Sequence, residues 1–190
     1  MYEAIGIGVS AGGINALKHI IPILPHDYPL AVIVIQHRIH TAEDFLVEFL
    51  NNHSAIRVKE AQLGEVIKPG CVYIGPSGYH LLIERNKTFS LSIDPPVNYV
   101  MPSVDVLFES AALAYQDKFI GLIMTGANHD GSKGLAKVKK YGGMAIVQDP
   151  ATAEVAVMPQ AAIDIVKVDY IIPLHEMGIF FKNLKFIGET

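Results

Sequence analysis

Three side chains that together could perform nucleophilic catalysis stand at three separate turns of this chain. Ser10 lies in the glycine-rich segment 8–13, between an apolar run and residues whose apolar side chains recur at helical spacing. His37 follows another apolar run, and Asp130 lies in the glycine-bracketed turn 125–131. A hydroxyl, an imidazole base and a carboxylate that orients the base form a nucleophilic centre. Their order along the chain, Ser-His-Asp, differs from the Ser-Asp-His order of the α/β-hydrolases, which argues against an ordinary esterase of that fold.

The glycine-rich segment is compatible with two chemistries. A strand, a tight turn and a helix N-terminus leave backbone N–H groups that point toward one place, where the helix dipole favours negative charge. The spacing Gly8-x-Ser10-x-Gly12 matches a nucleophile elbow, which exposes a serine at the turn. The spacing Gly6-x-Gly8-x-x-x-Gly12 is a loose form of the dinucleotide-binding pattern, which holds a phosphate there.

The residues after the second apolar run help to separate these chemistries. An NAD-binding protein needs an acidic residue there for the ribose hydroxyls. The chain has Gln36, His37 and Arg38 instead, which excludes the NAD form. Arg38 could bind a 2′-phosphate, so an NADP- or phosphate-binding α/β module stays open as an alternative.

Each candidate catalytic residue also has a simpler structural explanation. Ser10 could cap the helix that follows it, and Asp130 could cap the helix that begins near residue 134. His37 could be an ordinary surface histidine, and His129, beside Asp130, is a rival for the role of base. The pair His37-x-x-His40 is a weak metal signal, because no cysteine partners accompany it.

The order of strand and helix patterns predicts the fold class. Expected strands lie at 4–7, 31–35, 57–58, 71–74, 119–124, 144–147 and 170–173, and a hairpin at 80–84 and 89–93. Expected helices begin after Ser10, after a Thr41 cap, after a Ser103 cap, at 134 and at Pro159. This order predicts a doubly wound, mostly parallel sheet with helices on both faces and an antiparallel hairpin excursion. Ligands of such sheets bind beyond the carboxyl ends of the strands, so the three candidate residues should meet at one edge.

Composition restricts the class of protein further. The 190 residues suit a single domain, 1–190. The net charge of −4 argues against a nucleic-acid partner. Cys71 is the only cysteine, which excludes a disulfide framework and cysteine-based zinc sites. We find no apolar run long enough to insert into a membrane and no signal peptide, so the chain is expected to be cytoplasmic.

Several separated motifs share their order with one known family. They resemble the catalytic domain of the bacterial chemotaxis protein-glutamate methylesterase (CheB type), and the resemblance covers nearly the whole chain. The motifs are residues 8–13, 34–37, 95–98, 102–108, 124–126, 130–131 and 142–143, followed by Gln148, Ala151, Met158 and Pro159.

The resemblance implies a reaction and a role for each candidate. Ser10 is then the nucleophile, His37 the general base and Asp130 its orienting carboxylate. The family hydrolyses methyl esters of receptor glutamates and releases methanol, and some members deamidate receptor glutamines. The reaction needs no metal or organic cofactor. The expected partner is the helical cytoplasmic region of a methylated chemoreceptor, and a separate regulatory or methyltransferase domain is a further candidate.

Two groups of residues are expected to complete the site. Backbone N–H groups of Ala11, Gly12, Gly13 and Ala127 are candidates for stabilising the oxyanion. The substrate cleft is expected to be lined by His80, Pro96, Asn98, Met101 and His129.

The chain also departs from the family. It opens directly on the first strand, so we expect no receiver domain in it. Ala11, Met101 and Ala127 stand where family members commonly have a threonine, a basic or polar residue and a methionine. A catalytically silent domain that binds a receptor is therefore a second alternative function.

Overall fold

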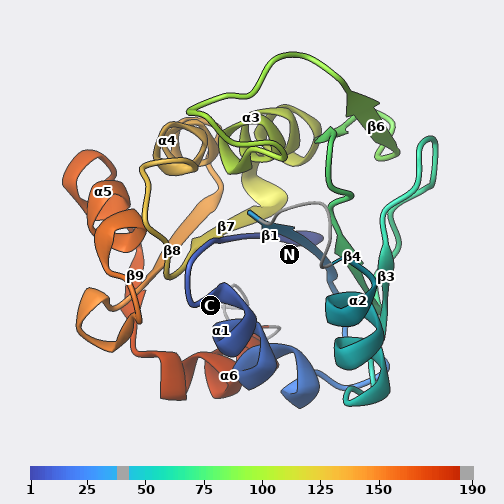
Figure 1. Cartoon of the computed structure of the whole chain (residues 1–190), viewed down its shortest axis with the longest axis horizontal. Helices are drawn as coiled ribbons and strands as arrows, with labels where there is room; N and C mark the ends of the chain where they lie inside the picture. Colours follow the sequence, from blue (N-terminus) through green and yellow to red (C-terminus); the bar gives the residue numbers. More distant parts are fainter. Residues whose placement is uncertain (38–42, 185–190) are drawn as a thin grey trace.

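A parallel sheet of seven strands, in the order β3-β4-β2-β1-β7-β8-β9, forms the centre of the molecule (Figure 1). The structure is a computed structural model and describes residues 1–37 and 43–184. The strands are β1 (Ala4–Val9), β2 (Ala31–Gln36), β3 (Arg57–Glu60), β4 (Cys71–Ile74), β7 (Phe119–Ile123), β8 (Met144–Gln148) and β9 (Tyr170–Ile172). β5 (His80–Ile83) and β6 (Phe89–Ser92) form a separate antiparallel hairpin. The predicted fold class is confirmed, including the hairpin excursion.

Helices cover both faces of the sheet (Figure 1). They are α1 (Gly13–Ile20), α2 (Glu43–Asn52), α3 (Val104–Tyr115), α4 (Ser132–Lys140), α5 (Val157–Ile165) and α6 (Leu174–Asn183), with short 3₁₀ segments at Ile21–Ile23, Gln116–Lys118 and Pro150–Thr152. Ser103 caps α3 as predicted, since its side chain accepts a hydrogen bond from the N–H of Val106. The sequence patterns did not predict α6. The proposed cap at Thr41 lies outside the described residues.

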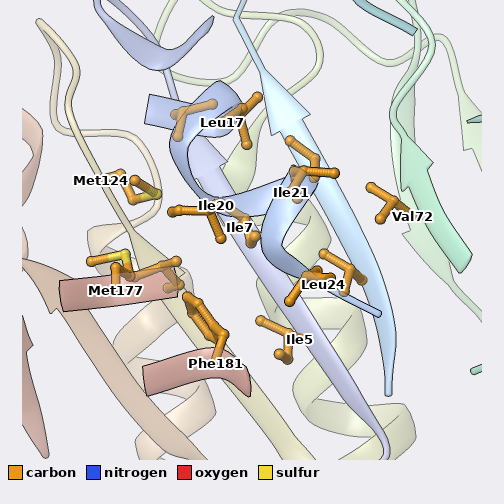
Figure 2. Packing of buried hydrophobic residues seen from close by; sticks show 14 of the residues in the cluster. Ile5, Ile7, Leu17, Ile20, Ile21, Leu24, Val72, Met124, Met177 and Phe181 are labelled. Atoms are coloured by element: carbon orange, nitrogen blue, oxygen red, sulfur yellow. The ribbon is translucent and has the colours of Figure 1, made fainter. Parts of the chain in front are cut away.

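Two apolar layers hold these helices to the sheet. On the face of α1 and α6, Leu17, Ile20, Met177 and Phe181 pack around the β1 side chains, as Figure 2 shows for Ile5 and its neighbours. Each fully buried side chain of this size contributes roughly 1.5–3 kcal/mol relative to its exposed state. These layers make the central strands a rigid base for the residues that follow them.

The start of α3 packs directly on β1. A Cβ atom at Gly8 would lie only 2.5 Å from a methyl group of Val104, so no larger residue fits there. This close approach brings the N-terminus of α3 over the carboxyl end of β1, where the candidate residues leave the sheet.

The direction of winding changes at β1, because β2 lies on one side of it and β7 on the other. Val9 is paired with Gln36, and Gly8 with both Ile35 and Ile123. Ser10, His37 and the turn after β7 therefore leave the sheet side by side at this switch point, the place where doubly wound folds bind ligands. Within the described residues, no helix has the length and apolarity required to cross a membrane.

Candidate active site

Ser10 is held at the end of β1 by its backbone. Its N–H donates to Thr125 O at 2.9 Å, and its carbonyl accepts from Gln36 Nε2 at 3.0 Å. The N-cap of α1 is Gly12, with a left-handed φ of 77°, so the alternative that Ser10 is the helix cap is wrong. Among the described residues the Ser10 hydroxyl has no hydrogen-bond partner, and it stays available for chemistry.

His37 lies next to Ser10 because the two strands are in register. Its N–H donates to Val9 O at 3.1 Å, which continues the β1–β2 ladder by one residue. Its ring is nearly buried, with 8% of the side chain exposed. Nε2 lies 2.8 Å from Asp130 Oδ2, and Nδ1 lies 3.1 Å from Asn128 Nδ2. Both ring nitrogens are therefore engaged, one by the carboxylate and one by an amide.

Asp130 is fully buried, with 0% of its side chain exposed, at the N-terminus of α3. Its Oδ2 accepts from His37 and from Val104 N at 2.6 Å, and its Oδ1 accepts from Ser103 Oγ at 2.8 Å. Burial raises the pKa of Asp130, but the bonds from His37, Val104 and Ser103 outweigh burial, and the net pKa lies below its ordinary value. Asp130 does not cap α4, as the structural alternative proposed, because Gly131 occupies that position without a side-chain cap.

A second carboxylate, Asp105, lies directly behind Asp130. Burial raises the pKa of Asp105, and the neighbouring charge of Asp130 adds to this effect, although the bonds from Gly134 N and from Asn98 oppose it. Gly134 N donates to Asp105 Oδ1 at 2.7 Å, which joins α3 to α4. Asn98 Nδ2 lies 3.0 Å from Asp105 Oδ2 and 3.2 Å from Asp130 Oδ1, so this one amide bridges the two carboxylates.

The expected cleft residues divide into two groups. Pro96, Asn98 and His129 are exposed and Met101 is half-buried, so these four are accessible to solvent, whereas His80 is not. His129 also lines a groove of about 380 Å³ with residues of α5. It is His37, and not His129, that contacts Asp130. Asn98 contacts the carboxylates, as described above.

The expectation for His80 is wrong. This side chain is only 1% exposed, so it is not accessible to a substrate. Its Nδ1 accepts from Ser103 N at 3.2 Å, and its Nε2 lies 3.3 Å from Pro95 O. His80 therefore joins the hairpin to the segment that precedes α3. Its position just after a glycine turn suggested exposure, but the packing of β5 against α3 encloses it.

One of the four backbone N–H groups expected to stabilise the oxyanion is not available for this role. The N–H of Gly13 donates to Ser10 O at 2.8 Å, so it is not free to bind an oxyanion. Within the described ranges, the N–H groups of Ala11, Gly12 and Ala127 have no acceptor, so these three keep their candidate role. Arg38 and His40, named above for a phosphate and a metal, lie outside the described residues.

Four residues that organise the site were not singled out as site residues in the sequence. Gln36 Nε2 donates to Ser10 O and to His37 O at 2.9 Å, and so ties two turns together. Thr125 Oγ1 donates to Ala11 O at 2.8 Å. The other two are Asn128, which contacts His37, and Ser103, which donates to Asp130. Gln36 could have been identified from the sequence, because it is a polar residue at the end of an apolar strand.

A serine on a strand-to-helix turn, beside a histidine that contacts a buried carboxylate, at the carboxyl edge of a parallel α/β sheet, defines a hydrolase-type site with a serine nucleophile. The comparison with known proteins identifies its family. The CheB methylesterase model matches residues 5–180, and the chain belongs to this family. The predicted resemblance and enzyme class are thereby confirmed.

Individual relatives agree with this assignment. The chain is 50% identical over 183 residues to a putative protein-glutamate methylesterase/protein-glutamine glutaminase of Leptospira interrogans, and the match covers 96% of this chain and 95% of that protein. It is 39% identical to the corresponding protein of Symbiobacterium thermophilum, of which it spans only 48%. The crystal structure of the Thermotoga maritima CheB methylesterase catalytic domain matches with a TM-score of 0.92 at 37% identity, covering 97% of this chain and 99% of that one.

Proposed function

We propose that this chain hydrolyses methyl esters of glutamate side chains on chemoreceptors and releases methanol. The observation that carries the proposal is the buried His37–Asp130 pair, joined at 2.8 Å, beside a serine whose hydroxyl has no partner among the described residues. Family membership favours this function over the NADP- or phosphate-binding alternative. The cytoplasmic location and the single domain 1–190 stay predictions.

The geometry supports a specific path for the proton. Asp130 accepts hydrogen bonds and is held ionised, so Nε2 of His37 must donate to it. Nδ1 is then the nitrogen that takes the proton when Ser10 Oγ attacks the ester carbonyl. The negative charge that develops on the carbonyl oxygen is stabilised by the N–H groups of Ala11 and Gly12, and such a donor contributes about 3 kcal/mol.

The second half of the reaction uses the same groups. His37 transfers the proton from Nδ1 to the methoxide oxygen, and methanol leaves an acyl-enzyme on Ser10. Water then attacks the acyl carbon while Nδ1 again takes a proton. The bond between Oγ and the acyl carbon breaks, Nδ1 returns the proton to Ser10 Oγ, and the glutamate carboxylic acid leaves and ionises in water. An amide substrate would follow the same path with ammonia as the leaving group. The Leptospira relative is a putative protein-glutamate methylesterase/protein-glutamine glutaminase, and we propose glutamine deamidation as the second reaction.

The receptor is proposed to approach the exposed side of the site. His129 and Pro96 are exposed, and His129 lines a groove of about 380 Å³ along α5. A helix that carries a methylated glutamate presents such a side chain on its surface, and the ester must reach the N–H groups of Ala11 and Gly12.

Methanol release from methylated receptor membranes tests the proposal directly. The wild-type chain should release methanol, and the Ser10→Ala variant should not. Labelling with a fluorophosphonate separates the enzyme from a catalytically silent receptor-binding domain, because only an activated serine reacts. A wild-type chain that neither labels nor releases methanol, while binding receptor membranes, would support the silent alternative.

A further inference from the structure

Asn128 holds the nitrogen of His37 that the reaction needs. Its side-chain amide lies between the backbone of Asp130 and the imidazole ring. Asn128 Oδ1 accepts from Asp130 N at 3.0 Å, and Asn128 Nδ2 lies 3.1 Å from His37 Nδ1. The first contact requires a hydrogen-bond acceptor, so the orientation of the amide is determined, and its NH₂ group faces the imidazole.

This orientation determines the form of the imidazole. An NH₂ group only donates, so Nδ1 of His37 must accept and carries no proton. Nε2 faces Asp130 Oδ2 at 2.8 Å and must donate. His37 is thus a neutral imidazole with its proton on Nε2 and its lone pair directed at Asn128. An imidazolium would place two donors against each other at Nδ1.

The same lone pair is needed by Ser10. Nδ1 has one lone pair, and in the described residues the Ser10 hydroxyl makes no hydrogen bond to it. The amide of Asn128 therefore competes with the hydroxyl of Ser10 for the base.

We propose that Asn128 is a positioning residue that caps the His37 lone pair in the resting site and releases it to Ser10 when substrate binds. It sets the Nε2–H form of the ring and makes the serine about fivefold less reactive between turnovers. The inference about Ser10 rests on the proposed function, whereas the form of the ring can be measured without any substrate.

Among residues 1–37 and 43–184, the carboxylates around His37 come from two elements, and Arg38 lies outside these ranges. Asp130 contacts the ring from the loop after β7, and Asp105 lies behind it in the first turn of α3. Asn128→Ala removes the acceptor of Asp130 N, whereas Asn128→Asp keeps it, so comparing the two variants separates an effect on the ring from a shift of Asp130.

Two substitutions separate the cap from a purely structural role. Asn128→Ala removes the cap, and fluorophosphonate labelling of Ser10 should become about fivefold faster, the factor expected for one ordinary net hydrogen bond. In labelling, Oγ bonds to phosphorus, fluoride leaves, and Nδ1 takes the hydroxyl proton. In Asn128→Asp, one carboxylate oxygen still accepts from Asp130 N, and the other oxygen places an acceptor opposite His37 Nδ1. A proton is then favoured on Nδ1, so labelling should become at least about tenfold slower and its rising limb should move to higher pH.

Asn86→Ala is the matched control. Asn86 Oδ1 accepts from Thr88 N at 3.2 Å in the hairpin turn, the same two-residue contact that Asn128 makes to Asp130 N. This control should leave labelling unchanged.

Nitrogen NMR of the His37 ring decides the proposal even if Ser10 does not label at all. The wild-type chain should show an unprotonated Nδ1 and a protonated Nε2 at neutral pH, and Asn128→Asp should shift the proton toward Nδ1. A wild-type ring protonated on Nδ1, or slower labelling of Asn128→Ala than of the wild type, would overturn it. Absence of labelling in the wild type together with the expected ring form would refute the proposed function and leave the ring assignment standing.

Discussion

Replacing Asp130 by asparagine removes the buried charge and keeps the size of the side chain. Oδ2 faces the two shortest nitrogen donors, His37 Nε2 at 2.8 Å and Val104 N at 2.6 Å, so the amide oxygen of the variant should take this place. The NH₂ group then replaces Oδ1. There the donors of Asn98 and Asp105, at 3.2 and 3.3 Å, lose their acceptor, whereas the Ser103 hydroxyl at 2.8 Å can rotate and accept from the NH₂ group.

The rate should fall because the imidazolium of the transition state loses its counter-charge. Two unit charges about 4 Å apart interact by about 4 kcal/mol at an effective dielectric constant of 20. This corresponds to about a thousandfold in rate. The ring keeps a hydrogen bond from Nε2 to the amide oxygen, so we expect the loss to stay below the roughly 10⁴-fold typical when the wrong tautomer is trapped.

The stability should also fall, in a way that depends on pH. Each lost hydrogen bond contributes about 1 kcal/mol, so the variant should be about 2 kcal/mol less stable at neutral pH. The pKa of Asp130 is lowered in the native state, so its stabilising effect is present above the unfolded value, near 3.9, and is lost as the pH falls through the native value. The difference between wild type and variant should therefore shrink below about pH 4.

Methanol release at saturating substrate and urea unfolding at several pH values measure both effects. The reasoning would be refuted by a variant that keeps more than about a tenth of wild-type turnover. It would also be refuted by a stability difference that stays constant from pH 7 to about pH 2.5, because the charge of Asp130 would then not be its source.

Four further substitutions test the remaining assignments. Ser10→Ala should abolish methanol release while urea unfolding changes by less than about 1 kcal/mol, because Ser10 caps no helix; release above about a hundredth of wild type would place the nucleophile elsewhere. His37→Gln should lose on the order of 10³-fold in kcat, whereas His129→Gln should change KM and leave kcat within about threefold; the reverse pattern would make His129 the base. His80→Leu should lower the free energy of unfolding by about 1–3 kcal/mol, since it leaves the buried Ser103 N–H without an acceptor, and an unchanged unfolding curve would contradict the hydrogen bond described.

The fold was predictable because the buried strands are apolar throughout. β1, β2 and β7 are entirely buried, and such strands give continuous apolar runs that flanking polar turns delimit. α6 was missed because Gly178 in its middle weakens the helical pattern. That glycine packs closely against the side chain of Ile23, a tertiary contact that no local pattern reports.

The sheet topology predicted which residues form the candidate site, but it did not predict the contacts that these residues make. The carboxyl ends of the strands in a parallel sheet lie at one edge. Topology alone therefore predicts that Ser10, His37 and Asp130 lie close together. The bonds from α3 to Asp130, and from Asn128 to His37, depend on the exact course of the turns. The burial of His80 depends on packing between the hairpin and α3. Such contacts lie beyond what residue type and spacing can report.

The contact between His37 and Asp130 joins residues 93 positions apart in the chain. The two strands that carry Ser10 and His37 are complete by residue 36, but their carboxylate partner follows only after β7. During synthesis, at about 5–20 residues per second, the first two groups wait for several seconds before the third emerges. In a nascent chain, the serine hydroxyl is therefore not activated until β7 has paired with β1. In refolding, the return of serine reactivity should mark the pairing of β7 with β1, a late and long-range event.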